Sequence, residues 1–366
     1  MIPVTKPYLP NREKLNKYID GIYERNWLTN NGLLVQELTC RLQEYLGVEH
    51  LLLVANGTLA LQIAYRALGI SNCQPGERPE AITTPFTFIA TSSSLKWDGV
   101  EPVFVDIDPN TWCMDPANIE AAITPETRAI VPVHVFGNAC DVEAIGDIAR
   151  KHDLKLIYDA SHAFGVKYKG ESLLRYGDAV TLSFHATKLF HTGEGGAIVF
   201  KRKEDLERAR KMINFGITGP ECIEELGINA KMNELQAAMG LCVLDEMDEN
   251  LKVRADVWLR YEQVLGKTLQ LQLKHQSLGY NYAYFPVVFN SEEEAMRVAA
   301  ALKEHGVQAR RYFYPSLESV SCLGAQADPP TSKDVASRIL CLPVFDQLAQ
   351  ADQRTIIALI EAELTL

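Results

Sequence analysis

Short apolar runs alternate with amphipathic segments along most of the chain. Each run is rich in Val, Ile and Leu and ends in small or polar residues, as buried parallel strands do. Between the runs, apolar residues recur every three or four positions, the period of a helix that buries one face. This alternation predicts an α/β fold, in which helices cover both faces of a mostly parallel sheet. The predicted strands fall at residues 51–54, 102–107, 129–137, 156–159 and 178–183.

The order of elements changes in the last part of the chain. A long helix from Asn233 to about Leu265 is predicted to connect two lobes. The elements predicted beyond it are a capped helix at residues 291–305, strands at 282–289, 308–314 and 340–344, and a final helix. We therefore predict two domains, a large one at residues 1–250, which includes the N-terminal segment, and a small α+β one at residues 251–366.

Composition narrows the class of protein. Hydrophobic residues make up 47% of the 366 residues and charged residues 23%, as in ordinary globular proteins. The net charge of −11 argues against a general nucleic-acid or membrane surface. We expect no signal peptide in the first residues, and no apolar run is long enough to span a membrane. The 8 cysteines form no Cys-x-x-Cys pair, so we expect reduced thiols in a cytoplasmic protein without a metal site.

One lysine stands directly after a predicted strand. Lys188 ends the segment Ser-Phe-His-Ala-Thr-Lys at 183–188, and another apolar run begins at Gly196. Most lysines are solvated on the surface, and that is the alternative here. A lysine held between two buried strands is instead a candidate for a desolvated amine with a lowered pKa, the kind that bonds to aldehydes.

A carboxylate complements this lysine. Asp159 ends the apolar run at 156–159, and ligands in open α/β sheets bind at the carboxyl ends of the strands. A site for pyridoxal phosphate (PLP) needs a lysine for the aldehyde and an anion for the ring nitrogen. We therefore predict Lys188 and Asp159 as the catalytic pair. A helix cap or a metal ligand is the alternative role of Asp159.

A turn between a strand and a helix offers a phosphate site. Gly57 lets the backbone approach a ligand, and Thr58 lies near the helix N-terminus, where free N–H groups favour an anion. Capping the helix is the alternative role of Thr58. Ser183 adds a hydroxyl for the same phosphate.

Three segments together resemble the signature of the PLP-dependent nucleotide-sugar aminotransferases of the DegT/DnrJ/StrS type. They are residues 159–165 (Asp-Ala-Ser-His-Ala-Phe-Gly), 183–188 and 194–196 (Glu-Gly-Gly), and the similarity runs from Trp27 to Pro315. The resemblance implies the type I, aspartate-aminotransferase-like fold, PLP as cofactor, and a homodimer with shared active sites.

The resemblance also implies roles for single residues. In the family, an aromatic residue matching Phe88 stacks on the coenzyme, although a core aromatic is the alternative, and the position of His162 lies close to the coenzyme's phenolic oxygen. Where the family carries Asn-Tyr-Arg and reaches the partner subunit's coenzyme phosphate, this chain has Asn229, Ala and Lys231. Lysine supplies a point charge there, not a bidentate fork. The resemblance implies Trp27 and Asn30 as substrate neighbours, with a packing loop as the alternative. The candidates in the C-terminal part to face the sugar nucleotide, each with a solvated or packing role as the alternative, are Arg310, Arg311, Tyr312 and Tyr314.

The implied reaction moves an amino group in two stages. L-Glutamate gives up its amino group and leaves as 2-oxoglutarate, and a nucleotide-linked keto sugar then takes that group. Lys188 serves as general base and acid, and Asp159 keeps the ring nitrogen protonated. Residues 3–10, 227–232 and 311–315 are most similar to the branch that converts dTDP-4-keto-6-deoxy-D-glucose to dTDP-4-amino-4,6-dideoxy-D-glucose for surface polysaccharide such as O-antigen.

Several alternatives stay open. A 3-keto sugar or a UDP-linked 4-keto sugar is the alternative substrate, because pocket shape decides between them. Sugar dehydratases of the same fold carry histidine in place of the lysine, and Lys188 argues against that activity. The intact pair of Asp159 and Lys188 disfavours a non-catalytic sensor that binds PLP or a sugar nucleotide. A redox enzyme is disfavoured because no Gly-x-Gly-x-x-Gly turn follows a strand.

Overall fold

The computed structural model describes residues 1–71, 76–324 and 328–365, and its centre is a seven-stranded sheet in the order β1-β9-β8-β5-β4-β2-β3. β9 runs antiparallel to both neighbours, and every other adjacent pair is parallel. The mostly parallel α/β sheet predicted from the apolar runs is therefore confirmed. Its strands are β1 (Leu51–Val54), β2 (Glu80–Thr83), β3 (Glu101–Phe104), β4 (Thr127–Val131), β5 (Lys155–Asp159), β8 (Ala179–Ser183) and β9 (Gly196–Phe200).

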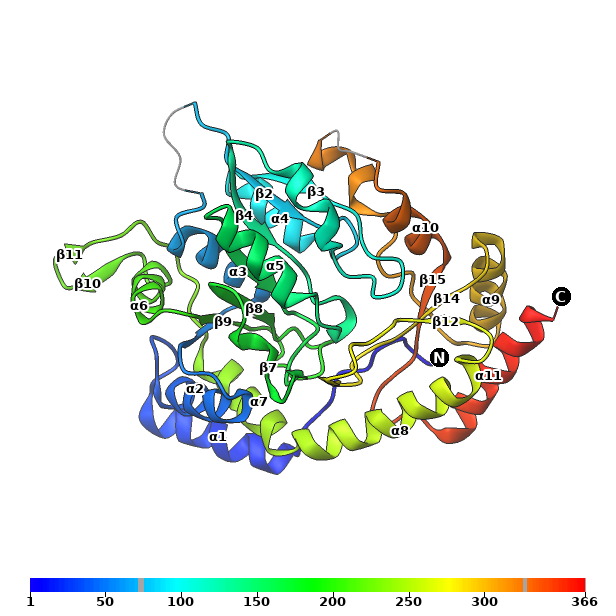
Figure 1. Ribbon diagram of the computed structural model, residues 1–366. Helices are drawn as coiled ribbons and strands as arrows, with labels where there is room; N and C mark the ends of the chain where they lie inside the picture. Colours follow the sequence, from blue (N-terminus) through cyan, green and yellow to red (C-terminus); the bar gives the residue numbers. More distant parts are fainter. Residues whose placement is uncertain (72–75, 325–327, 366) are drawn as a thin grey trace.

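Helices cover both faces of this sheet (Figure 1). Leu51 and Leu53 of β1 belong to one core, and Leu52 and Val54 belong to the core on the opposite face. Because both faces are buried, the strands are apolar at successive positions, which is why they are visible as continuous runs in the sequence. The first face is covered by α2 (Leu33–Leu46), α5 (Val142–Lys151) and α7 (Glu234–Asp245), with α1 (Arg12–Arg25) against α7. The other face is covered by α3 (Gly57–Ala67), α4 (Ala90–Trp97) and α6 (Lys203–Met212).

The helix predicted from Asn233 to Leu265 is wrong in one respect, because it is two helices. α7 ends at Asp245, and α8 (Met247–Leu265) follows Glu246, whose φ of −111° and ψ of 11° are not helical. α8 runs from the large sheet to the C-terminal part of the chain (Figure 1). The predicted domain boundary between residues 250 and 251 falls within α8, and the division into two domains stays a prediction.

The C-terminal part has a sheet and a core of its own. β12 (Gln270–Leu271), β14 (Phe285–Val288) and β15 (Ile339–Leu342) form a three-stranded antiparallel sheet. Its apolar residues pack with those of α8, α9 (Glu292–Glu304) and α11 (Gln350–Leu364).

The strand predicted at 308–314 is wrong. Within that segment Arg310 alone forms a bridge, to Cys341. The chain then leaves the sheet, because the rings of Tyr312 and Phe313 pack against Phe136.

The shorter elements complete the described chain. Two small sheets lie outside the main ones: a three-stranded sheet in the order β13-β6-β7, and the β10–β11 hairpin, which projects at the left of Figure 1. The remaining helices and strands are β6 (Lys167–Tyr168), β7 (Glu171–Ser172), β10 (Ile217–Gly219), β11 (Cys222–Ile223), β13 (Leu278–Gly279), α10 (Pro330–Arg338) and the 3-10 turns η1 (Pro116–Asn118), η2 (Glu120–Ala122), η3 (Val135–Gly137), η4 (Leu173–Arg175), η5 (Leu317–Ser319) and η6 (Ser321–Leu323). Among the residues described, no helix combines the length and apolarity that crossing a membrane requires.

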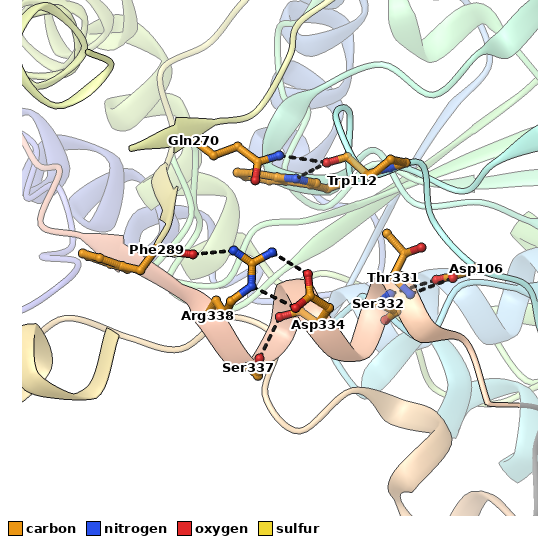
Figure 2. A network of polar contacts seen from close by, with 10 residues as sticks. Asp106, Trp112, Gln270, Phe289, Thr331, Ser332, Asp334, Ser337 and Arg338 are labelled. Atoms are coloured by element: carbon orange, nitrogen blue, oxygen red, sulfur yellow. Dashed lines mark hydrogen bonds and ion pairs between the residues drawn. The ribbon is translucent and has the colours of Figure 1, made fainter. Parts of the chain in front are cut away.

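A carboxylate joins the C-terminal part to the large sheet. Asp106, just after β3, accepts hydrogen bonds from the backbone N–H groups of Thr331 (2.9 Å) and Ser332 (2.8 Å), as Figure 2 shows. These are first-turn amides of α10, which have no acceptor within the helix. Asp106 therefore acts as a cap supplied from another part of the chain, and its charge is favourable at a helix N-terminus.

Candidate active site

The carboxyl ends of the parallel strands open onto a cavity of about 650 Å³. β1 leads to Gly57, β5 ends at Asp159, and β8 ends at Ser183. The reversed strand β9 begins beside Ser183, so the loop that carries Lys188 turns back over the same edge. The predicted site residues that line this cavity are Gly57, Thr58, Phe88, Asp159, His162, Ser183, Lys188, Arg310 and Tyr312.

Asp159 is buried, with 5% of its surface exposed, and its carboxylate is fixed by three donors. Oδ1 accepts hydrogen bonds from the backbone N–H of Ser161 (3.0 Å) and from Ser161 Oγ (2.6 Å). Oδ2 accepts one from Thr91 Oγ1 (2.8 Å), whose hydroxyl also contacts Thr87 Oγ1. These contacts hold a negative charge in one orientation at the wall of the cavity.

Lys188 is partly buried, and its amine is shifted toward the neutral form. Removal from solvent lowers the pKa of Lys188 to about 8, the Asp159 carboxylate opposes this shift, and the Arg310 guanidinium adds to it. An ordinary lysine is almost fully protonated at neutral pH. Lys188 therefore presents a reactive fraction of neutral amine under conditions where an ordinary exposed lysine does not.

His162 is a neutral donor in a fixed position. Its Nδ1 accepts a hydrogen bond from the backbone N–H of Phe136 (3.1 Å), so the neutral ring carries its proton on Nε2. Burial, and then the charge of Lys188, hold the pKa of His162 well below its usual value. The ring is stacked against Phe136 (5.9 Å between centroids) and Phe313 (5.7 Å), which prevents it from turning.

The N-terminus of α3 forms one end of the cavity. Asn56 caps the helix, since its side chain accepts from the N–H of Leu59 (2.9 Å), so the alternative that Thr58 is the cap is wrong. The N–H groups of Gly57 and Thr58 have no acceptor within the helix. A Cβ on Gly57 would lie 2.8 Å from Ser183 Cβ, closer than real Cβ contacts, so glycine is required at this approach.

The residues present fit PLP. The two free amides of α3 and the Ser183 hydroxyl form a cradle for a phosphate. Asp159 is a buried anion for the ring nitrogen, and Lys188 is a low-pKa amine for the aldehyde. Phe88 is half exposed at the wall, where its ring can cover a bound ligand. In the part of the chain that the structure describes, no three His, Cys, Asp or Glu residues are placed to share a metal ion.

The other predicted site residues do not line this cavity. Asn30 and Lys231 line a second cavity, of about 540 Å³, where Lys231 Nζ donates to Asn214 Oδ1 (2.6 Å). Asn229 forms an antiparallel backbone bridge with Asn214. Trp27, three residues before Asn30 in the sequence, is half exposed. The structure therefore places these residues apart from Lys188 of the same chain.

Arg311 and Tyr314 also lie outside the cavity of Lys188. Arg311 Nη2 donates to Glu292 Oε1 (2.6 Å) and to the carbonyl of Ser337 (2.7 Å), and its guanidinium lies 3.5 Å from the centre of the Tyr314 ring. Among the tandem arginines, only Arg310 lines the cavity.

Sequence reasoning missed three residues of the site. Thr91 and Ser161 hold Asp159, and Tyr284 accepts a hydrogen bond from Lys188 Nζ (3.3 Å). A hydroxyl within two residues of a strand-end carboxylate is a usable signal for Ser161. No local pattern identifies Thr91 or Tyr284, because both reach the site from elements far away in the chain.

Comparison with known proteins agrees with this site. The chain matches the DegT/DnrJ/EryC1/StrS aminotransferase family over residues 10–361. It is 43% identical to a dTDP-4-amino-4,6-dideoxy-D-glucose transaminase of Shigella dysenteriae, over 94% of both chains, and 37% identical to one of Escherichia coli, over 95% of this chain and 94% of that protein. The crystal structure of DesI in the presence of its TDP-sugar product superposes with a TM-score of 0.91 at 33% identity, over 100% of this chain and 93% of that one. The resemblance seen in the sequence is therefore confirmed, and the chain belongs to the DegT/DnrJ/EryC1/StrS family of PLP-dependent sugar aminotransferases.

Proposed function

We propose that this protein binds PLP and transfers an amino group from L-glutamate to dTDP-4-keto-6-deoxy-D-glucose, giving dTDP-4-amino-4,6-dideoxy-D-glucose. The observation that carries the reaction type is the meeting of Lys188, with a pKa of about 8, and the buried Asp159 at one cavity. The two relatives that bear the name of this product support the choice of sugar.

Each site residue has a task in this reaction. PLP, when bound, supplies a ring that accepts the electrons left behind when a proton leaves the carbon bearing the amino group. Asp159 would hold a proton on the ring nitrogen, and His162 would donate its Nε2–H to the ring oxygen. The neutral amine of Lys188 would take the proton from the α-carbon of glutamate and pass it to C4′ of the coenzyme; in the second stage it would move a proton from C4′ to the sugar carbon.

Arg310 is suited to an oxyanion of the substrate. It lines the cavity beside Tyr312, with its guanidinium 4.3 Å from the centre of that ring. Its neighbour Arg311 is ion-paired with Glu292, whereas Arg310 has no carboxylate partner among the residues described. A guanidinium free of such a partner can bind a carboxylate or phosphate through two hydrogen bonds.

We further propose a homodimer in which the active sites are shared. Exposed apolar side chains occur on the β10–β11 hairpin and in segments next in sequence to residues that line the second cavity: Trp27, Leu28, Leu33, Phe215, Ile217, Ile223, Leu226, Ile228 and Leu235. A face of this kind is typical of an interface with another protein. In the proposed dimer, Asn229 and Lys231 reach the coenzyme phosphate of the partner subunit, and Trp27 and Asn30 lie at the interface.

A mixing experiment tests the sharing of sites. Lys188→Ala subunits are combined with Asn229→Ala/Lys231→Ala subunits, each inactive as a pure dimer, and unfolded and refolded together. Mixed dimers contain one intact site if Asn229 and Lys231 act on the partner, so activity returns. No return of activity, although mass spectrometry shows mixed dimers, contradicts shared sites.

The cellular setting is also part of the proposal. The cysteines that the structure describes are free thiols, which suits the reducing cytoplasm. We place the reaction there, with its amino sugar destined for surface polysaccharide such as O-antigen.

The reaction is tested with a panel of sugars. Purified protein with PLP is incubated with L-glutamate and either dTDP-4-keto-6-deoxy-D-glucose, a UDP-linked 4-keto sugar or a dTDP-linked 3-keto sugar, and 2-oxoglutarate is measured. Release is expected with the first sugar, at a kcat/KM at least tenfold above the others. Preference for another sugar contradicts the substrate, and silence across the panel from PLP-loaded protein favours a sensor.

A further inference from the structure

Lys188 is contacted by a residue that does not line the cavity. Among the residues described, its Nζ makes one hydrogen bond, to Tyr284 Oη at 3.3 Å. Tyr284 does not line the cavity, and only 6% of its surface is exposed. Its contact is therefore with the amine and not with a substrate in the cavity.

Both the backbone and the ring of Tyr284 are held in place by neighbouring residues. Its carbonyl oxygen accepts hydrogen bonds from Trp258 Nε1 (2.9 Å) and Tyr280 Oη (3.3 Å). Its ring packs against His162, with 4.7 Å between centroids, and against Phe136, with 5.6 Å. The residue sits just before β14, so the small sheet determines where the hydroxyl points.

The chemistry of a phenol suits an amine that changes its charge. Burial raises the pKa of Tyr284, so the hydroxyl keeps its proton throughout the pH range of activity. A neutral phenol accepts a hydrogen bond from an ammonium group and donates one to a neutral amine. No proton has to leave Tyr284 in either state.

Charged groups also lie near Lys188, but among the residues described none forms a hydrogen bond with its amine. The Asp159 carboxylate, at the end of β5, raises the pKa of the amine, and the Arg310 guanidinium, from the segment after α9, lowers it. His162 is neutral beside it. Tyr284 alone, among the residues described, touches the nitrogen at hydrogen-bond distance.

We propose that Tyr284 is a positioning residue, which holds Lys188 Nζ in line for proton transfer by accepting a hydrogen bond from the protonated amine and donating one to the neutral amine. Its part in the reaction rests on the proposed function, whereas its effect on the amine does not. A free amine on a long, flexible side chain would sample many positions, and a fixed partner restricts it to the productive one.

The first test needs neither coenzyme nor sugar. In the coenzyme-free protein, the rate of acetylation of Lys188 by acetic anhydride is measured against pH by mass spectrometry, which gives the pKa of the amine. Tyr284→Phe removes the acceptor of the charged form but keeps the ring packing, so the pKa is expected to fall by about 1. The matched control is Tyr261→Phe, a buried tyrosine packed on Phe285 whose hydroxyl has no partner among the residues described. It should leave the pKa of Lys188 unchanged.

The second test separates positioning from binding. With L-glutamate as donor, Tyr284→Phe is expected to lower kcat about 10- to 100-fold, a typical loss for an imperfectly placed proton-transfer group, with KM unchanged. A raised KM with an unchanged kcat, or a Lys188 pKa equal to that of the parent protein, overturns the proposal. If the parent protein proves to be no aminotransferase, the acetylation test still decides whether Tyr284 holds the amine.

Discussion

Replacing Asp159 by Asn removes one charge from the site with little change of shape. The backbone N–H of Ser161 is a fixed donor, 3.0 Å from Oδ1, so the amide oxygen of Asn must occupy that position. The new NH₂ group then faces Thr91 Oγ1, 2.8 Å from Oδ2. Thr91 can accept this bond because its own proton can turn to Thr87 Oγ1, 3.0 Å away. The variant is therefore expected to fold with an intact hydrogen-bond network.

The Asp159→Asn variant is expected to lose reaction rate and not stability. Without a carboxylate, the ring nitrogen of PLP loses the partner that keeps it protonated. Removing one such preorganised electrostatic group typically costs about 3–4 kcal/mol in the transition state, or about 10²–10³-fold in kcat. The Asp159 charge also raises the pKa of Lys188, so that pKa should fall below about 8 in the variant.

The assay is a single turnover with L-glutamate. PLP-loaded protein is mixed with the donor in a stopped-flow instrument, and the change in coenzyme absorbance gives the rate. Asp147→Asn, an exposed aspartate of α5 paired with Arg150, is the matched control and should react like the parent protein. A variant at Asp159 that keeps more than about a tenth of the parent rate refutes the reasoning, because a fall of at least about 10² is expected.

Three further predictions follow from the same geometry. Gly57→Ala forces α3 away from Ser183 Cβ, which a new Cβ would approach to 2.8 Å, so a coenzyme titration should show PLP affinity lowered about 10- to 100-fold, as overpacking of about 1–3 kcal/mol implies. Asp106→Ala removes the cap of α10 and should lower the free energy of unfolding by about 1–2 kcal/mol in urea, whereas Asp20→Ala, on the exposed side of α1, should leave it within about 0.5 kcal/mol. The rate at which coenzyme-free protein takes up PLP should rise with pH and level off above about 8, because the neutral amine of Lys188 reacts and its pKa is about 8; a rate that climbs on to pH 10, as for an ordinary lysine, contradicts the shifted pKa.

The parts of this fold that the sequence predicts are those with local causes. Each buried strand of the large sheet is an apolar run because helices cover both faces, and each run ends where the chain reaches the edge that binds ligands. Asp159 and Lys188 could be identified because Asp159 ends one such run and Lys188 lies in the short loop after another. The break at Glu246 could not, because the segment from Asn233 to Leu265 keeps a helical pattern on both sides of it.

The parts that escaped prediction depend on contacts between distant segments. Tyr284 reaches Lys188 from 96 residues away, across the junction of the two sheets. Arg310 and Arg311 are adjacent and chemically identical, and distant contacts distinguish them: Arg310 pairs with Cys341 and lines the cavity, whereas Arg311 is bound by Glu292 outside it. Asn229 and Lys231 carry a proposed role in a partner subunit, which a single chain does not display.

The most direct test of the account is to locate the coenzyme on the chain. Protein loaded with PLP is reduced with borohydride, digested, and analysed by mass spectrometry, with Lys188→Ala as the comparison. One modified peptide is expected, with the coenzyme attached to Lys188, and no such peptide is expected from the variant. Attachment to a different lysine, or protein that takes up no PLP, would contradict it.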